Sequence, residues 1–107
     1  MKKAIYRQGD VLIITVAGVP DKAQPVERDQ QRIILAYGEV TGHAHAILDL
    51  ETELLSVADQ VDRWLRVGGT GAQVVHEEHA TISLPPGSYQ VRIQREYSPE
   101  AIRRVVD

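Results

Sequence analysis

Asp10-Val11-Leu12-Ile13-Ile14-Thr15-Val16 is a run of mostly β-branched and aliphatic residues, introduced by Gly9 and stopped by Gly18 and Pro20. β-Branched side chains pack well on a pleated surface, and glycine and proline interrupt strands, so this segment predicts a buried β-strand. Residues 20–31 follow with two prolines and three glutamines, which is a composition typical of an exposed loop.

Several later segments show the same strand pattern. Strands are predicted over residues 32–37, 43–50, 51–58, 63–67 and 89–97, since each is short, rich in strand-forming residues and bounded by turn residues. A helix over 51–66 is the alternative for the middle of the chain. Residues 74–84 form either one long strand or a hairpin that turns at Glu77-Glu78. After Pro99, residues 100–106 form either a short helix or a last edge strand.

Length and pattern together indicate one all-β domain. A chain of 107 residues is long enough to bury roughly two thirds of its unfolded surface around a single core. Many short strands with glycine and proline turns, and at most one short helix, predict an all-β sandwich or a small barrel, and we favour a single-domain barrel over residues 1–107. GroES-like and cupin-like barrels both fit this size, and the pattern does not separate them.

The composition excludes several classes of function. With no cysteine, the chain has no thiolate nucleophile and no cysteine-based zinc site. A formal net charge of −3 argues against non-specific coating of nucleic acid, which depends on an excess of Lys and Arg. No apolar run approaches the ~20 residues of a membrane span, and the start of the chain does not resemble a signal peptide. We therefore expect a cytoplasmic protein without a membrane partner.

The four histidines occur in two short segments. His43 and His45 end the sequence Gly-Glu-Val-Thr-Gly-His-Ala-His at 38–45, and His76 and His79 bound the sequence His-Glu-Glu-His. Alternate residues of a strand share a face, so the first pair points one way, whereas the second pair would point in opposite directions in an unbroken strand. Imidazole, with an unperturbed pKa of roughly 6.5, both gives and takes protons near neutral pH and is the commonest metal ligand.

One chemistry that these residues predict is a metal site. His43, His45 and one histidine of the second pair would bind a divalent ion such as zinc, together with a carboxylate from Glu77 or Glu78. If only three of these protein ligands bind, a position stays open for water. All four histidines are candidate ligands in this alternative. The order, a His-X-His pair followed some thirty residues later by another histidine, is also the order seen in cupins, although this chain lacks the glutamate that closely follows the pair in cupins.

The other chemistry is metal-independent cleavage of RNA. One histidine would take the proton of the attacking 2′-hydroxyl, and another would give a proton to the departing 5′-oxygen, so that no metal cofactor is needed. The charged phosphorane would need cationic or hydrogen-bond-donating partners. The candidates for that role are Arg66, Arg95, Tyr37 and Tyr97.

A third possibility is a non-catalytic, oligomeric binding module. A short β domain has edge strands, and association of identical chains can cover or pair those edges. We therefore also expect a homo-oligomer.

Four motifs together resemble a family of small bacterial, phage and metagenomic proteins, from Arg7 over nearly the whole chain. They are Gly-Glu-Val-Thr-Gly-His-Ala-His at 38–45, His-Glu-Glu-His at 76–79, Leu-Pro-Pro-Gly-Ser-Tyr at 84–89 and Gln-Arg-Glu-Tyr at 94–97. That family is associated with metal-ion-independent ribonucleases of GroES-like fold. The resemblance implies an endoribonuclease that produces a 2′,3′-cyclic phosphate, with His43, His45 and His76 or His79 as the catalytic residues. Between the chemistries we favour this one, with the metal site as the alternative.

Overall fold

The computed structural model describes residues 4–38, 40 and 42–94. Within those residues the chain folds into ten β-strands and no α-helix, which confirms the all-β class. None of the described segments is a helix long and apolar enough to span a bilayer. The strands are β1 Ile5–Gln8, β2 Val11–Val16, β3 Gln24–Pro25, β4 Ile33–Tyr37, β5 Ala44–Ile47, β6 Thr52–Ser56, β7 Arg63–Val67, β8 Ala72–Val75, β9 Ile82–Leu84 and β10 Gly87–Ile93.

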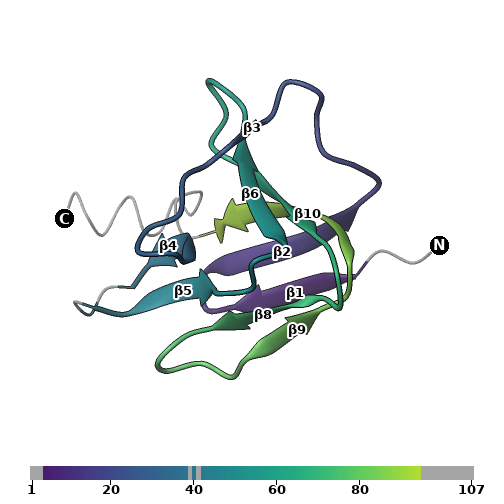
Figure 1. The fold of residues 1–107 in the computed structure, drawn as a ribbon. Coiled ribbons are helices and arrows are strands. Elements are labelled where there is room, and N and C mark those ends of the chain that lie inside the picture. Colours follow the sequence, from purple (N-terminus) through teal and green to yellow (C-terminus); the bar gives the residue numbers. More distant parts are fainter. Residues whose placement is uncertain (1–3, 39, 41, 95–107) are drawn as a thin grey trace.

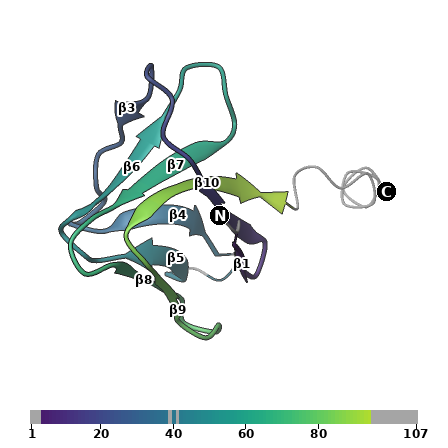
Figure 2. The ribbon, with the colours of Figure 1, turned by 90° about the vertical axis from the view of Figure 1, so that its right-hand side faces the viewer.

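The strands form two antiparallel sheets (Figures 1 and 2). One sheet has the order β1-β2-β10-β7-β6-β3, and the other has the order β4-β5-β8-β9. Neither sheet closes on itself over the part of the chain that the structure describes. The two sheets therefore establish the β architecture, while the closed barrel, GroES-like or cupin-like, stays a prediction.

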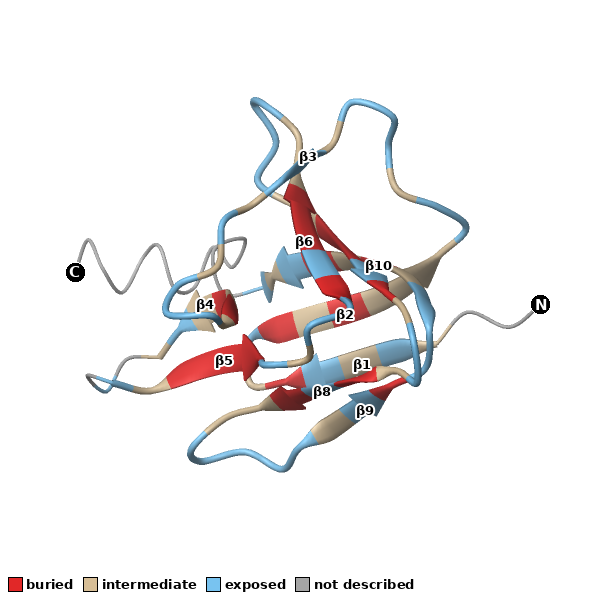
Figure 3. Ribbon diagram, viewed as in Figure 1, coloured by how far each residue is buried: buried red, intermediate tan, exposed pale blue. Residues whose placement is uncertain are grey.

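The hydrophobic core lies between the two sheets. Ile13 and Leu65 from the larger sheet and Ile47 and Val74 from the smaller one are fully buried in the same cluster. Figure 3 shows this burial along β2, β5, β6 and β8. Each such side chain contributes roughly 1.5–3 kcal/mol when it is removed from water. The two sheets are thus held together mainly by apolar contact.

Most of the predicted strands form. β2 and β4 lie where expected, and β6 and β7 pair antiparallel, so the alternative helix over 51–66 does not form. Strand β5 is shorter than predicted and ends at Ile47. Leu48 and Leu50, which lie beyond the end of this strand, are 57% and 84% exposed.

The segment 74–84 is a hairpin and not a continuous strand. Strand β8 ends at Val75 and pairs antiparallel with β9, so that residues 76–81 form the connecting loop. Strand β9 then ends at Leu84, and β10 begins at Gly87, two residues before the predicted start of that strand. The alternatives for 100–106 lie outside the described residues.

Gln8 connects the two sheets. It is the last residue of β1, it is 2% exposed, and its amide nitrogen donates to the carbonyls of Val74 and Ala80. Gly9 follows with φ of 59°, as the first central residue of a two-residue type II′ turn requires. The β1–β2 turn is therefore placed against the β8–β9 hairpin.

Candidate histidine site

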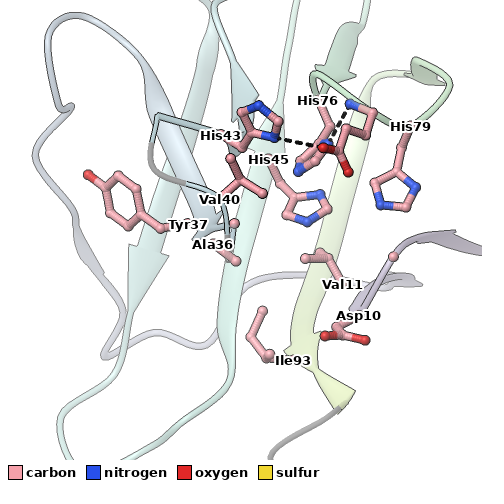
Figure 4. A pocket seen from close by; sticks show the side chains of 13 residues that line it. Asp10, Val11, Ala36, Tyr37, Val40, His43, His45, His76, His79 and Ile93 are labelled. Atoms are coloured by element: carbon pink, nitrogen blue, oxygen red, sulfur yellow. Dashed lines mark hydrogen bonds and ion pairs between the residues drawn. The ribbon is translucent and has the colours of Figure 1, made fainter.

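All four histidine rings meet in one place. The ring centroids of His45 and His76 lie 4.3 Å apart, those of His76 and His79 lie 4.7 Å apart, and those of His43 and His76 lie 5.8 Å apart. The rings line a cavity of about 310 Å³ that Val11, Ile93 and other residues complete (Figure 4). The pocket that the two histidine segments predicted is present.

Strand β5 and the loop before it supply the first pair. His45 is 6% exposed and lies opposite Ala36 of β4, whose small side chain also lines the cavity. His43 is held at the base of the β4–β5 loop, where its carbonyl accepts the Gly38 N–H over 2.8 Å. Both rings therefore project from one side of the β4–β5 hairpin, as strand alternation requires.

The β8–β9 loop supplies the second pair. Because residues 76–81 turn, His76 and His79 need not point in opposite directions, and their rings lie side by side. The Glu77 carboxylate accepts the backbone N–H of Ala44 over 3.0 Å and ties this loop to the start of β5. That hydrogen bond lowers the pKa of Glu77 below its ordinary value, and nearby His43 and His76 contribute in the same direction.

Gln8 determines which nitrogen of His45 carries the proton. Both amide hydrogens of Gln8 are used on backbone carbonyls, so its Oε1, 2.8 Å from His45 Nδ1, must accept. His45 Nδ1 is therefore the donor. In the neutral ring, Nε2 then carries the lone pair.

Glu78 determines which nitrogen carries a proton in two further rings, those of His76 and His43. Its backbone N–H donates to His76 Nδ1 over 2.9 Å, so neutral His76 carries its proton on Nε2. Its carboxylate Oε2 lies 3.3 Å from His43 Nδ1, and the exposed fractions of the His43 and Glu78 side chains are 24% and 59%. The carboxylate can only accept, so His43 Nδ1–H is the donor in this pair.

The hydrogen bonds thus give three rings different chemical properties. In their neutral forms, His45 carries its lone pair on Nε2 and His76 carries its proton on Nε2. His43, when protonated, keeps one N–H on Glu78 and has a second N–H on Nε2 to give. His79 stacks on His45 with ring centroids 5.8 Å apart and an interplanar angle of 23°.

The cavity is poor in fixed positive charge. Asp10 and Glu78 are its carboxylates, and no Lys or Arg of the described part of the chain lines it. Of the predicted phosphate-binding residues, Tyr37 lines the cavity, but its hydroxyl donates to Asp29 and the pKa of that hydroxyl is raised by this bond. Arg66 pairs with Glu53 and is not at the cavity. Arg95 and Tyr97 lie outside the described residues.

A metal could be bound only with rearrangement. One ligand atom each from His43, His76 and Glu77 lies within 4.8 Å of the others. A neutral imidazole has one lone pair, however, and that of His76 accepts the Glu78 N–H. His76 must release this hydrogen bond before it can coordinate a metal through either nitrogen.

Sequence reasoning missed two residues of this site. Gln8 bonds to His45, and Gly9 lies so close that a Cβ placed on it would be 3.0 Å from His79 Nε2 and 3.3 Å from His45 Cε1. The available signal was a polar residue followed by glycine directly before the clearest strand. That signal identifies a turn but does not indicate which side chains the turn approaches.

Comparison with known proteins gives a family. No curated protein and no solved structure matches the chain. The family described as "Domain of unknown function (DUF8820)" matches residues 7–94, which include both histidine segments and nearly all of the described fold. The chain therefore belongs to the DUF8820 family, whose function is unknown.

Proposed function

We propose that the protein is a metal-ion-independent endoribonuclease that cleaves RNA by transesterification. The observation that carries this proposal is the set of hydrogen bonds that decides which ring nitrogens carry protons: neutral His45 has its lone pair on Nε2, whereas protonated His43 keeps one N–H on Glu78 and has a second N–H on Nε2. Acid/base catalysis needs both a proton acceptor and a proton donor at one place. The resemblance to metal-ion-independent ribonucleases of GroES-like fold supports the same interpretation.

The proposed step assigns a role to each of three rings. His45 Nε2 takes the proton of the 2′-hydroxyl while that oxygen forms its bond to phosphorus. The bond from phosphorus to the 5′-oxygen breaks, and protonated His43 gives its Nε2 proton to the departing oxygen. The products are a 2′,3′-cyclic phosphate and a free 5′-hydroxyl. His45 ends protonated and His43 ends neutral, so exchange with water restores both.

His76 serves as a fixed hydrogen-bond donor in this scheme. While its Nδ1 accepts the Glu78 N–H, the ring is neutral, and a neutral imidazole N–H is too weak an acid to protonate a leaving group. It can donate to a non-bridging phosphorane oxygen, the role for which oxyanion donors are worth about 10²–10³-fold in rate. The His76 ring contacts both the proposed acid and the proposed base, with centroids 5.8 Å from His43 and 4.3 Å from His45.

The charge of the cavity limits how RNA is held. Since no Lys or Arg among the described lining residues neutralises the phosphate, positive charge must come from imidazolium and from Arg95, which stays a candidate. We propose that binding is weak and localised to one phosphodiester. Affinity should therefore fall only modestly with salt, because few counterions are released.

The deciding experiment uses purified protein and a mixed-sequence RNA in excess EDTA. Cleavage that persists and leaves 2′,3′-cyclic ends supports the proposal. His45→Ala should lower kcat by about 10²–10⁴-fold, the contribution of a positioned base, without weakening RNA binding. Arg66→Ala is the matched control, because Arg66 lies away from the cavity, and it should cleave like wild type. Absence of cleavage by a folded protein would contradict the proposal and favour a non-catalytic binding module.

The second candidate is a divalent metal site, and the proximity of His43, His76 and Glu77 favours it. Zinc would fit two imidazoles and a carboxylate, and it would leave a position for water. Stoichiometric metal in the purified protein, together with loss of activity on chelation, would establish this candidate and overturn the first. Metal binding should also remove the Glu78 N–H bond to His76, which an amide shift would report.

We also propose a homo-oligomer. In the described part of the chain, strands β1 and β3 end one sheet and strands β4 and β9 end the other. Edge strands present backbone groups that a second copy can pair. The molar mass measured by light scattering during size-exclusion chromatography tests this, and a mass of 11.9 kDa at all concentrations would contradict it.

A further inference from the structure

Gln8 is the residue outside the histidine segments whose contacts bear most directly on the site. Its side chain is buried between the two sheets, and each of its amide atoms has a partner of fixed type. The Nε2 atom lies 3.1 Å from the Val74 carbonyl and 2.9 Å from the Ala80 carbonyl. Rotating the amide by half a turn would place its oxygen against two other oxygens, so the orientation is determined.

We propose that Gln8 is a positioning residue that holds His45 in the tautomer with the proton on Nδ1. The catalytic consequence rests on the ribonuclease function proposed above, whereas the tautomer itself does not. With Oε1 as a fixed acceptor 2.8 Å away, His45 Nδ1 must donate. The other tautomer would set two lone pairs against each other at a buried site, where an unmade hydrogen bond is costly.

This positioning matters because an imidazole in water prefers the opposite tautomer, with the proton on Nε2. A His45 in that form would present an N–H where the proposed base needs a lone pair. Gln8 therefore acts through His45 and does not itself touch the reacting atoms. The general principle is that the group bonded to one ring nitrogen decides the chemistry of the other.

The two hydrogen bonds that the Gln8 side chain donates also explain why its amide is held in one position. Its two donor bonds go to the strand β8 residue Val74 and to Ala80 in the β8–β9 loop, which also carries His76 and His79. One side chain thus connects β1, β5 and the β8–β9 hairpin. A shift of the hairpin would move the acceptor of His45, so the two histidine pairs are coupled through a single amide.

The first test reads the tautomer directly in the wild-type protein. Nitrogen-15 NMR of the histidine rings, at about pH 8, above the roughly 6.5 of an unperturbed imidazole, distinguishes a protonated ring nitrogen from one that carries a lone pair. The His45 signals are assigned by their loss in His45→Ala. We expect Nδ1 protonated and Nε2 unprotonated. The reverse pattern would overturn the proposal whether or not the protein cleaves RNA.

Variants at Gln8 then separate positioning from stability. Gln8→Met keeps the size but removes all three hydrogen bonds, so His45 should redistribute toward the Nε2–H tautomer and kcat should fall on the order of tenfold, a part of the base contribution. Gln8→Glu keeps an acceptor facing Nδ1 and should keep the Nδ1–H signal. Gln90→Met is the matched control: it removes an amide that bonds Asp62 in another part of the fold, and it should change neither the His45 signals nor kcat.

The outcomes distinguish the two proposals. An Nδ1–H pattern that Gln8→Met abolishes, in a protein without RNA cleavage, would retain the positioning role and reject the ribonuclease. An unchanged His45 tautomer in folded Gln8→Met would reject the positioning role, even if RNA is cleaved.

Discussion

The backbone N–H of Glu78 donates to Nδ1 of His76, two residues earlier in the chain, over 2.9 Å. This short-range bond, made inside the β8–β9 loop, determines what His76 can do. It occupies the lone pair of the neutral ring, so the ring can donate through Nε2 but can neither coordinate a metal nor take a proton without losing the bond. The carboxylate of Glu78 also pairs with His43.

A comparison of His76→Gln with His76→Ala tests this assignment. Glutamine can place an N–H near the position of the His76 Nε2–H, whereas alanine offers no donor. If His76 is a neutral donor, His76→Ala should lower kcat by about 10²–10³-fold and His76→Gln by only about tenfold. RNA cleavage rates under single-turnover conditions measure both. Equal loss in the two variants would instead indicate a metal ligand or a proton-transferring residue.

The pH dependence of stability should contain a contribution from Glu77. Its pKa in the folded protein is lowered from the ordinary value of 4.5, mainly by the Ala44 N–H. A lowered folded pKa gives stability that is complete above the unfolded pKa and is lost as the pH falls through the folded one. Glu77→Gln keeps an acceptor for Ala44 but has no charge to titrate.

Urea unfolding at about pH 7 and about pH 3 measures this contribution. At the higher pH the free energy of unfolding should be larger for wild type than for Glu77→Gln. At the lower pH the two values should converge. Glu53→Gln is the control, since Glu53 forms an exposed pair with Arg66 and such pairs contribute little. A difference for Glu77→Gln that grows toward low pH would contradict the prediction.

Gly9 should not tolerate a side chain. Its φ of 59° costs a non-glycine residue roughly 1–2 kcal/mol, and a Cβ would lie 3.0 Å from His79 Nε2. Gly9→Ala should therefore lower the free energy of unfolding by about that amount and displace the His79 ring. A Cβ placed on Gly18 would meet no atom within 4 Å, and Gly18 has no positive φ, so Gly18→Ala should be neutral or slightly stabilising. Denaturant titration of both variants tests the contrast.

The turn before β4 should be open to stabilisation. Gln30 and Gln31 have φ of 54° and 70°, in the left-handed region, which suits Asn or Gly and strains other residues. Gln31→Gly should raise the free energy of unfolding by roughly 0.5–1 kcal/mol. Gln60→Gly, at a loop position without a positive φ, should not raise it. A melting temperature for Gln31→Gly at or below that of wild type would contradict this prediction.

Sequence alone determined the class of the fold and the residues of the candidate site. The positions of β2, β4, β6 and β7 followed from local composition. Runs of β-branched residues between turn residues favour strands, and this preference depends on residues that are neighbours in the sequence. The concentration of every histidine in two segments likewise identified the candidate reactive residues, since residue type is a property of the chain itself.

Only the tertiary structure decided how those histidines differ from one another. Whether residues 74–84 turn, and so bring His79 beside His76, depends on the pairing of β8 with β9 and on the Glu77 bond to Ala44. The proton position on His45 depends on Gln8, which is distant in sequence and is brought to His45 where the two sheets meet. Hydrogen-bond partners that are far apart along the chain leave no periodic or compositional trace, so the pattern of residues predicted the presence of the pocket but not the division of proton donors and acceptors within it.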